Sequence, residues 1–209
     1  MSIKDNYKDS SAKSKDKTSK FGLALLGLSG GVAIAVSIVG LSFISPALRK
    51  ICLPYVPATT AQINNVMTAL SGRSGRLIDI GSGDGRIVLA AAKMGFRADG
   101  VELNPWLVAF SRLQAYRLGL ASSTKFYRKN LWKFNLQPYQ NIVIFGVEEM
   151  MLDLEDKLCR EIDSDTYVVA CRFPFPTWIP DNTFGSGIDT VWLYKNPVTS
   201  INNKMERQD

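Results

Sequence analysis

Three glycines and two acidic residues follow a short apolar segment and form the part of the chain with the clearest chemical meaning. The stretch Leu77-Ile-Asp-Ile-Gly-Ser-Gly-Asp-Gly-Arg86 carries Gly81, Gly83 and Gly85 at alternate positions. Glycine lets the backbone pass close to a ligand where a side chain would clash, and the amides at the start of a following helix point into the same space. The stretch predicts a strand, a ligand-binding loop and a helix in succession.

A second acidic position comes at the end of the next predicted strand. The sequence Val101-Glu-Leu-Asn104 places Glu102 at the tip of that strand. In Rossmann-like sites an acidic residue at this point accepts hydrogen bonds from ribose hydroxyls. The two stretches together predict a nucleoside site.

The glycine spacing and the flanking charges indicate the kind of ligand. Dinucleotide sites use Gly-x-Gly-x-x-Gly, which brings a pyrophosphate onto the helix amides. Here the pattern is Gly-x-Gly-x-Gly, with Asp79 before it and Asp84 within it. Two carboxylates would repel a pyrophosphate, but they suit S-adenosylmethionine, which carries an ammonium and a sulfonium. The alternative is a glycine turn in some other α/β protein.

The segments around these residues alternate between strand and helix patterns. Strands are expected at 76–80, 97–102, 124–128, 141–145, 166–172 and 189–194, and helices at 58–70, 86–94, 105–119 and 148–162. This alternation is typical of a doubly wound, mostly parallel sheet. We expect one α/β domain over residues 58–195, with the seven-strand Rossmann-like class I methyltransferase fold.

In such a sheet the ligand lies at the carboxyl ends of the strands. We therefore expect the residues after the third and fourth strands, 130–132 and 145–147, to join the same cleft. Asn130 is placed to hydrogen-bond an adenine amine, and Trp132 either lies beside the ring or packs in the core. The predicted cofactor residues are Asp79, Gly81, Ser82, Gly83, Asp84, Gly85, Glu102, Leu103, Asn104, Asn130 and Leu131.

The stretch Arg172-Phe-Pro-Phe-Pro-Thr-Trp178 follows the fifth strand and is aromatic, mostly apolar and stiffened by two prolines. It is either a substrate-binding lip, a membrane-facing surface or a hydrophobic plug beneath the last strand. The lip hypothesis makes Phe145, Arg172 and Pro174 the substrate-side residues. No catalytic base and no metal ligand are assigned.

The N-terminal part of the chain has a different character. Residues 21–45 contain no charged residue, a length sufficient to span a bilayer, which takes roughly 20 residues. We expect a single transmembrane anchor here, since the apolar region of a signal peptide is usually about 7–15 residues long. Residues 1–20 are expected to be a disordered, lysine-rich tail, 46–57 a linker and 196–209 a C-terminal tail.

Charge and composition exclude several functional classes. The chain has a net charge of +6, but residues 51–209 hold 17 basic and 16 acidic residues, so the excess lies around the anchor. This argues against a nucleic-acid-binding domain. The three cysteines form no metal or disulfide pattern, and the absence of histidine removes Ser-His and Cys-His catalysis.

Several motifs resemble those of the mitochondrial, membrane-anchored protein lysine methyltransferases. They are Pro46-Ala-Leu-Arg-Lys, Leu53-Pro-Tyr-Val-Pro-Ala-Thr-Thr60, Asp79-Ile-Gly-Ser-Gly-Asp-Gly-Arg-Ile-Val88, Glu102-Leu-Asn-Pro-Trp-Leu-Val108, Leu131-Trp-Lys133, Val143-Ile-Phe-Gly-Val147, Ala170-Cys-Arg-Phe-Pro-Phe-Pro176 and Gly187-Ile-Asp-Thr-Val-Trp192. The resemblance covers residues 46–195. One departure is Asn130, where the family has an acidic residue, so weaker or altered cofactor binding is expected.

The resemblance implies an S-adenosylmethionine-dependent protein-lysine N-methyltransferase. Members of the family trimethylate a lysine of the ATP synthase c-subunit or of the adenine nucleotide translocase, and the Phe-Gly-Val and Cys-Arg-Phe-Pro-Phe-Pro stretches are closer to the c-subunit enzyme. It also implies the mitochondrial inner membrane, with the catalytic domain facing the matrix, the bilayer and a membrane protein as partners and no nucleic acid. A small-molecule or lipid methyltransferase and a non-catalytic assembly factor are the other readings.

Overall fold

The computed structural model describes residues 27–34, 36–37 and 56–195. Residues 1–45 and 46–209 form separate units. In the first unit, residues 27–34 and 36–37 are helical and exposed. Within the described ranges, no helix has both the length and the apolar character needed to cross a membrane. The predicted tail 1–20, most of the predicted anchor 21–45 and linker 46–57, and the tail 196–209 lie outside the described residues.

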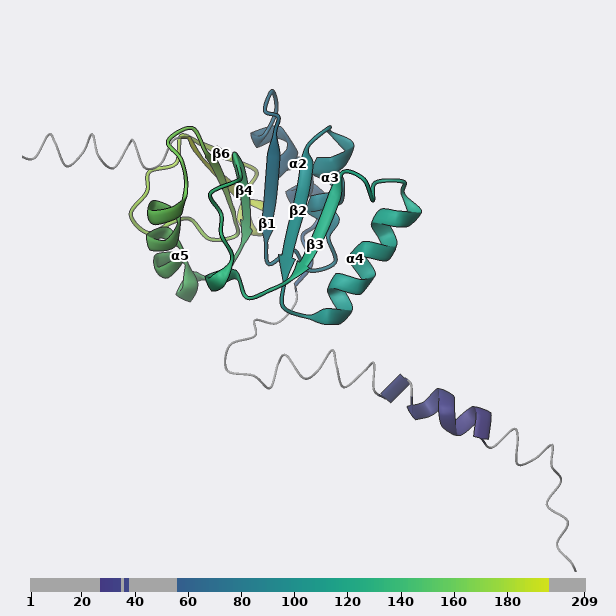
Figure 1. Cartoon of the computed structure of the whole chain (residues 1–209). Coiled ribbons are helices and arrows are strands. Elements are labelled where there is room, and N and C mark those ends of the chain that lie inside the picture. Colours follow the sequence, from purple (N-terminus) through teal and green to yellow (C-terminus); the bar gives the residue numbers. More distant parts are fainter. Residues whose placement is uncertain (1–26, 35, 38–55, 196–209) are drawn as a thin grey trace, which may run out of the picture. The chain divides into compact units, whose positions relative to one another are not determined.

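The second unit is built on a seven-stranded sheet (Figure 1). Its strands are β1 (Arg76–Ile80), β2 (Arg97–Glu102), β3 (Thr124–Arg128), β4 (Asn141–Phe145), β5 (Tyr167–Cys171), β6 (Asn182–Phe184) and β7 (Val191–Lys195), in the order β3-β2-β1-β4-β5-β7-β6. Strands β1 to β5 pair in parallel, and β7 is antiparallel to both neighbours. The central strands are buried on both faces, which explains their nearly continuous apolar sequences.

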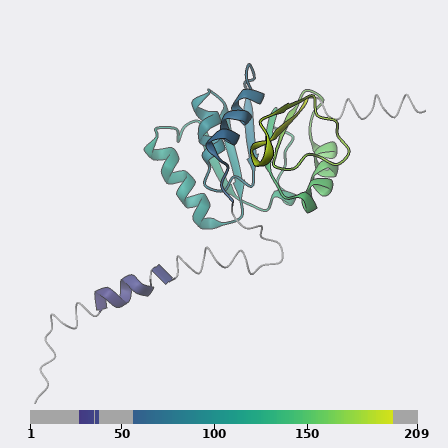
Figure 2. The same cartoon turned by 180° about the vertical axis from the view of Figure 1, so that it is seen from behind.

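Three helices cover one face of the sheet (Figure 2). They are α2 (Thr60–Ala69), α3 (Arg86–Lys93) and α4 (Pro105–Arg117). Thr59 caps α2 by accepting a hydrogen bond from the Gln62 amide at 3.0 Å. Asn104 caps α4, and Pro105 at the first helical position supplies a preset φ. These caps determine where the two helices begin.

Among the residues that the structure describes, the opposite face has one α-helix, α5 (Glu148–Glu161). The rest of that face is covered by the connection that contains η2 (Leu131–Lys133) and by the loop after β5. In that loop Phe175 and Trp178 are buried and pack against Tyr194 of β7, with ring centroids 5.2 and 5.7 Å away. For these two side chains the hydrophobic plug is the correct reading, whereas Pro174 is exposed.

The predicted strands and helices are confirmed, with ends shifted by at most two residues. Strand β7 begins at Val191 rather than at residue 189, because residues 187–189 form the short helix η3 (Gly187–Asp189). The strand β6 has no counterpart in the prediction. It is three residues long and mostly exposed, so it lacks the apolar alternation that marks a strand in a sequence.

Candidate active site

The loop between β1 and α3 is shaped by its three glycines. Gly81, Gly83 and Gly85 have φ angles of 77°, 53° and 80°, a region that residues with a Cβ adopt at a cost. The amides of Gly81 and Ser82 both donate to the carbonyl oxygen of Val101, at 2.9 and 3.0 Å. The loop is therefore held against the carboxyl end of β2, where the second predicted motif begins.

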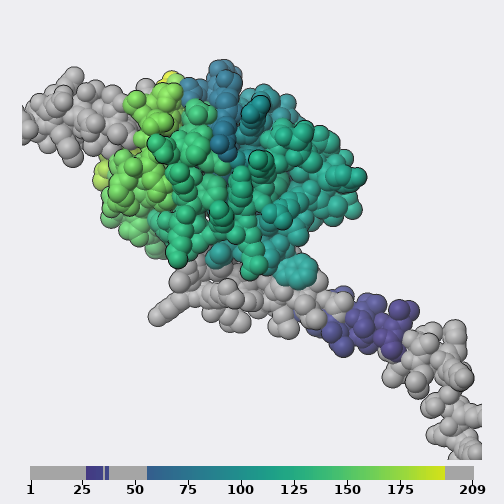
Figure 3. Space-filling view, viewed as in Figure 1, coloured from purple at the N-terminus to yellow at the C-terminus, as the bar shows by residue number. Residues whose placement is uncertain are grey.

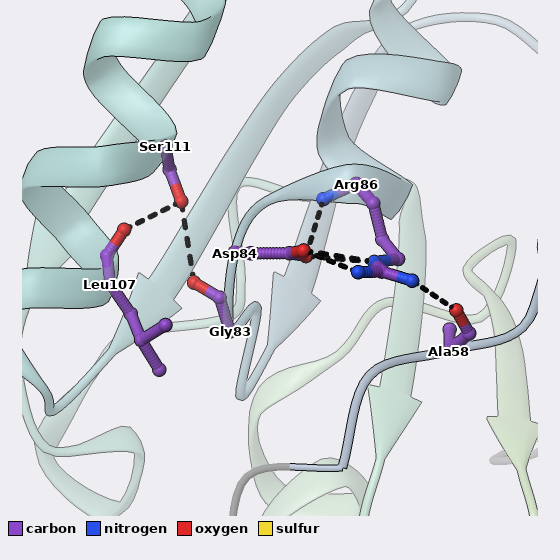
Figure 4. Close-up of polar contacts among 6 residues, drawn as sticks. All are labelled: Ala58, Gly83, Asp84, Arg86, Leu107 and Ser111. Carbon is purple, nitrogen blue, oxygen red and sulfur yellow. Dashed lines mark hydrogen bonds and ion pairs between the residues drawn. The ribbon is translucent and has the colours of Figure 1, made fainter. Parts of the chain in front are cut away.

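Gly85 also meets a steric limit. A Cβ at this position would lie 2.7 Å from Phe126 Cε1 and 2.8 Å from the Oγ atom of Ser111. The Ser111 hydroxyl is fully buried on α4 and lies 2.8 Å from the Leu107 carbonyl oxygen and 3.3 Å from that of Gly83 (Figure 4). α4 thus packs directly on the glycine loop, and no side chain fits between them.

Glu102 is bonded to the same loop from the end of β2. Its Oε2 atom accepts from the Gly83 amide at 3.1 Å, and its Oε1 atom accepts from the Asn104 amide at 2.7 Å. An ionised carboxylate can accept about four hydrogen bonds. Glu102 therefore keeps capacity for the two ribose hydroxyls while its position is already fixed by the protein.

Asp79 is the most unusual ionisable group of the site. It is 1% exposed, and its Oδ1 atom has no hydrogen-bond partner in the described structure. Burial, followed by the nearby carboxylates of Glu102 and Asp84, raises the pKa of Asp79 from 3.8 to about 8. A buried, unpartnered carboxyl group beside two other carboxylates has the surroundings that a cationic ligand would complete.

These features fit S-adenosylmethionine. Its ammonium and sulfonium would complement the acidic group of Asp79, and the Ser82 hydroxyl is a second buried polar group without a partner in the described residues. Glu102 keeps the capacity to accept the predicted hydrogen bonds from ribose hydroxyls, and the glycine loop leaves room for the backbone to approach a ligand. The carboxylates of Asp79, Asp84 and Glu102 would repel a pyrophosphate at the same place.

Asp84 has a protein partner within the loop (Figure 4). Its carboxylate accepts from Arg86 Nε at 2.9 Å and from Arg86 Nη2 at 2.5 Å. Arg86 Nη1 also donates to the Ala58 carbonyl oxygen at 2.6 Å. Asp84 is thus partly neutralised by Arg86, and its direct contact with the cofactor stays a prediction.

The two asparagines predicted for this site act as helix caps. Asn104 Oδ1 accepts from the Trp106 amide, and Asn130 Oδ1 accepts from the Trp132 amide, both at 3.0 Å. The oxygen of Asn130 has a second acceptor lone pair beside the one used by the cap, and its hydrogen bond to an adenine amine stays a prediction. Trp132 is 38% exposed, so the alternative that it packs in the core is wrong. Leu103 is also exposed, and Leu131 is half-buried.

Phe145 and Arg172 are brought together at the ends of β4 and β5. The Arg172 guanidinium carbon lies 5.6 Å from the centre of the Phe145 ring, and a Cβ on Gly81 would lie 3.6 Å from the Phe145 carbonyl oxygen. Within the described ranges, Arg172 is the one non-glycine residue with positive φ, at 72°. Backbone strain of this kind concentrates at functional sites. The exposed Pro174 follows two residues later.

Arg86 and Ser111 are site residues that the sequence prediction missed. Arg86 directly follows the glycine motif, so its place at the start of α3 was a usable signal. Ser111 carries no such signal, because its contact with Gly83 spans 28 residues of sequence. Gly100 belongs with them, since a Cβ there would lie 2.7 Å from the Ser82 hydroxyl.

Comparison with protein families gives two matches. Residues 79–182 match the ANTKMT methyltransferase domain, and residues 17–49 match the N-terminal domain of the ATP synthase C-subunit lysine N-methyltransferases. The second match extends the relationship from residue 46, where the resemblance was expected to begin, into the predicted anchor.

Individual relatives cover most of the chain. The human ATP synthase C-subunit lysine N-methyltransferase is 55% identical, over 91% of this chain and 85% of its own. The Caenorhabditis elegans protein of that name is 50% identical, over 83% and 96%. The mouse adenine nucleotide translocase lysine N-methyltransferase is 43% identical, over 82% and 77%.

Among solved structures, an RNA methyltransferase from Salinibacter ruber in complex with S-adenosyl-L-homocysteine superposes with a TM-score of 0.64. It is 29% identical, and the match covers 68% of this chain and 94% of that one. The expected class I methyltransferase fold is confirmed.

Proposed function

We propose that this chain, which belongs to the family of the ATP synthase C-subunit and adenine nucleotide translocase lysine N-methyltransferases, methylates a lysine of the ATP synthase c-subunit. The class of enzyme follows from its relatives and its fold: it is an S-adenosylmethionine-dependent protein-lysine N-methyltransferase. The observation that carries the structural argument is the buried, unpartnered carboxyl group of Asp79 beside the glycine loop.

Sequence similarity favours the c-subunit over the translocase as the substrate. The human, frog, rat, mouse and nematode relatives named for the c-subunit are 50–57% identical to this chain, against 43% for the mouse relative named for the translocase. The match of residues 17–49 is also to the N-terminal domain of the c-subunit enzymes. The translocase is the second candidate.

The protein contributes binding, orientation and dehydration to the reaction. S-adenosylmethionine, when bound, supplies an electrophilic methyl group. Asp79 and Glu102 hold the charged and the ribose parts of that cofactor, and the glycine loop admits it to the ends of β1 and β2. Correct placement of the two reactants accounts for much of the acceleration in such transfers.

The acceptor lysine must lose its proton before it can attack, and a free lysine has a pKa of about 10.4. Phe145 and Pro174 provide apolar surroundings at the end of β4 and in the loop after β5. An apolar environment disfavours the charged ammonium and so favours the neutral amine. We assign no general base, and the mechanism needs none if the proton leaves to solvent before transfer.

We place the chain in the mitochondrial inner membrane, with residues 21–45 as a single-pass anchor and the catalytic domain facing the matrix. The uncharged 25-residue stretch and its basic flanks support the anchor. The mitochondrial location and the matrix side rest on the resemblance to the mitochondrial family, since two basic flanks favour neither orientation. A shared membrane would confine enzyme and substrate, which raises the effective concentration of the target lysine.

The decisive experiment is mass spectrometry of the ATP synthase c-subunit from mitochondria that lack this chain, with add-back of the wild type or of Asp79→Asn. We expect a methylated lysine to disappear and to return only with the wild type. An unchanged c-subunit with unmethylated translocase would identify the second candidate. Unchanged methylation of both proteins would contradict the proposal and favour a small-molecule or lipid substrate. Rescue of the loss-of-protein phenotype by Asp79→Asn would indicate a non-catalytic assembly role.

A further inference from the structure

The charges of the catalytic domain are unevenly distributed along the chain. Residues 103–147 contain six basic and no acidic residues, although residues 51–209 as a whole are nearly neutral. The six are Arg112, Arg117, Lys125, Arg128, Lys129 and Lys133, and all of them are exposed. They lie on α4, on the edge strand β3 and on the segment that follows β3. These parts of the chain are coloured teal to green in Figure 3.

The outer face of α4 is apolar rather than polar. Trp106, Phe110 and Leu113 recur at the spacing of one helical face and are 39%, 45% and 45% exposed. The inner face of the same helix is already buried through Leu107, Val108, Ser111 and Ala115. The exposed stripe is therefore not needed for the core, and an outward aromatic stripe of this kind indicates an interaction surface.

An edge strand often carries lysines that prevent it from pairing with another sheet. That explanation suffices for Lys125 on β3. It does not account for Lys129 and Lys133, which lie beyond the strand, or for Trp106 and Phe110 on the helix. Aromatic and aliphatic side chains beside lysine and arginine are the composition of surfaces that bind at a membrane interface.

The path of the chain points to the same partner. Arg86 Nη1 bonds the Ala58 carbonyl oxygen, so the chain reaches the domain at the carboxyl edge of the sheet. Lys129 directly follows β3, and Trp106 lies in the first turn of α4, four residues after the end of β2. The 12 residues 46–57 separate Ala58 from the uncharged stretch, and a fully extended linker of that length spans at most about 40 Å.

We propose that the outer face of α4 around Trp106, Phe110 and Leu113, together with the adjoining segment 125–133, forms a docking surface for a lipid bilayer with anionic headgroups. The aromatic residues enter the interfacial region, and the cations contact the headgroups. Docking by this side holds the carboxyl edge of the sheet, and hence the methyl donor, near the membrane surface where an embedded substrate presents its lysine. The inference rests on the proposed membrane placement.

The test is lysine footprinting of the full-length chain with an amine-acetylating reagent and mass spectrometry. The chain is mixed with vesicles of phosphatidylcholine alone or with phosphatidylglycerol added. We expect anionic vesicles to slow acetylation of Lys129 and Lys133 by about threefold or more, because lysines that contact anionic headgroups are shielded from the reagent. The exposed Lys93 and Lys195, outside this surface, serve as internal references.

A pair of double variants separates the surface from general membrane binding. Trp106→Gln/Phe110→Gln should abolish the protection of Lys129 and Lys133. Tyr116→Gln/Leu118→Gln, at the other end of the same helix and exposed by 76% and 49%, should retain it. Both variants should bind S-adenosylhomocysteine with unchanged affinity in calorimetry, which verifies their fold.

Equal rates of acetylation of Lys129 and Lys133 with neutral and anionic vesicles would overturn the proposal, even if the chain binds neutral vesicles through another segment. Protection by a single-stranded oligonucleotide but not by anionic vesicles would also overturn it and assign the surface to nucleic acid. The footprint uses no protein substrate. A failure of the docking surface is therefore distinguishable from a failure of the proposed lysine methylation, which would show itself only in the methylation state of the substrate.

Discussion

The guanidinium of Arg86 forms two parallel bonds to the carboxylate of Asp84, 2.9 Å from Nε to Oδ1 and 2.5 Å from Nη2 to Oδ2. The same guanidinium donates to the Ala58 carbonyl oxygen. One side chain thus joins the cofactor loop to the segment that precedes α2. We infer that the contacts of Arg86 stabilise the conformation of the loop, in addition to the three glycines that permit it.

Arg86→Met should weaken cofactor binding by removing these contacts. Charge-assisted bonds contribute about 1.5–3 kcal/mol each, but Arg86 is partly exposed, so we expect a loss of about tenfold in affinity, toward the lower end of that range. Calorimetry with S-adenosylhomocysteine measures the effect. Arg86→Lys keeps the charge but not the paired geometry, so its cofactor affinity should lie between those of the wild type and Arg86→Met. Wild-type affinity in Arg86→Met would contradict the role.

Asp79→Asn tests the buried carboxyl group without changing its shape. We expect cofactor affinity to fall by tenfold or more, on the order of 1.4 kcal/mol for each factor of ten, because the neutral amide cannot complement a cation. Asp99→Asn is the matched control. Asp99 is also buried, but it accepts from Arg76 at 2.9 Å and Tyr139 at 2.7 Å. This control should lower the free energy of unfolding and leave cofactor affinity unchanged.

Asp79 should make the free energy of unfolding depend on pH. Its pKa rises from 3.8 to about 8 on folding, so the folded protein binds a proton that the unfolded chain releases above pH 4. The contribution of this group is therefore fully present below about pH 4 and is lost as the pH rises toward 8. Urea unfolding of the protein without cofactor measures it, and the Asp79→Asn variant should show a flatter profile between these values. An unchanged profile would contradict the raised pKa.

Two glycine substitutions separate backbone strain from crowding. Gly85→Ala combines a φ of 80° with contacts of 2.7 and 2.8 Å to Phe126 and Ser111. Gly95→Ala has a φ of 95° but nothing within 4 Å. We expect Gly95→Ala to cost about 1–2 kcal/mol from strain alone, and Gly85→Ala to cost about 1–3 kcal/mol more from overpacking. Chemical denaturation compares them, and equal losses would refute the crowding of Gly85.

Arg172→Gly should separate the side chain of Arg172 from its backbone. Glycine relieves the φ of 72°, so stability should stay level or rise by up to about 1 kcal/mol. Removal of the cation over Phe145 should slow lysine methylation at unchanged cofactor affinity. Arg172→Ala keeps the strain and should be the less stable of the two variants. Wild-type methylation rates in Arg172→Gly would exclude a substrate-side role.

Local sequence patterns sufficed for most of the elements and for the centre of the site. The strand ahead of the glycines, the alternate spacing of Gly81, Gly83 and Gly85, and Glu102 at the end of β2 are all features of consecutive residues. Neighbouring residues control backbone conformation and strand direction, so the carboxyl edge of the sheet could be predicted as the cofactor site. The caps at Thr59 and Asn104 are local for the same reason.

Only the tertiary structure decided which of these groups have partners. Asp79 and Asp84 are both aspartates of the same glycine motif. Asp79 is buried without a partner for its Oδ1 atom, whereas Asp84 is paired with Arg86. The contact of Ser111 with the loop, the burial of Phe175 and Trp178, and the exposure of Trp106 likewise depend on segments far apart in the chain. The burial and the hydrogen-bond partners of a side chain depend on how helices and strands pack together. A local sequence pattern does not predict which of these elements will cover a given side chain.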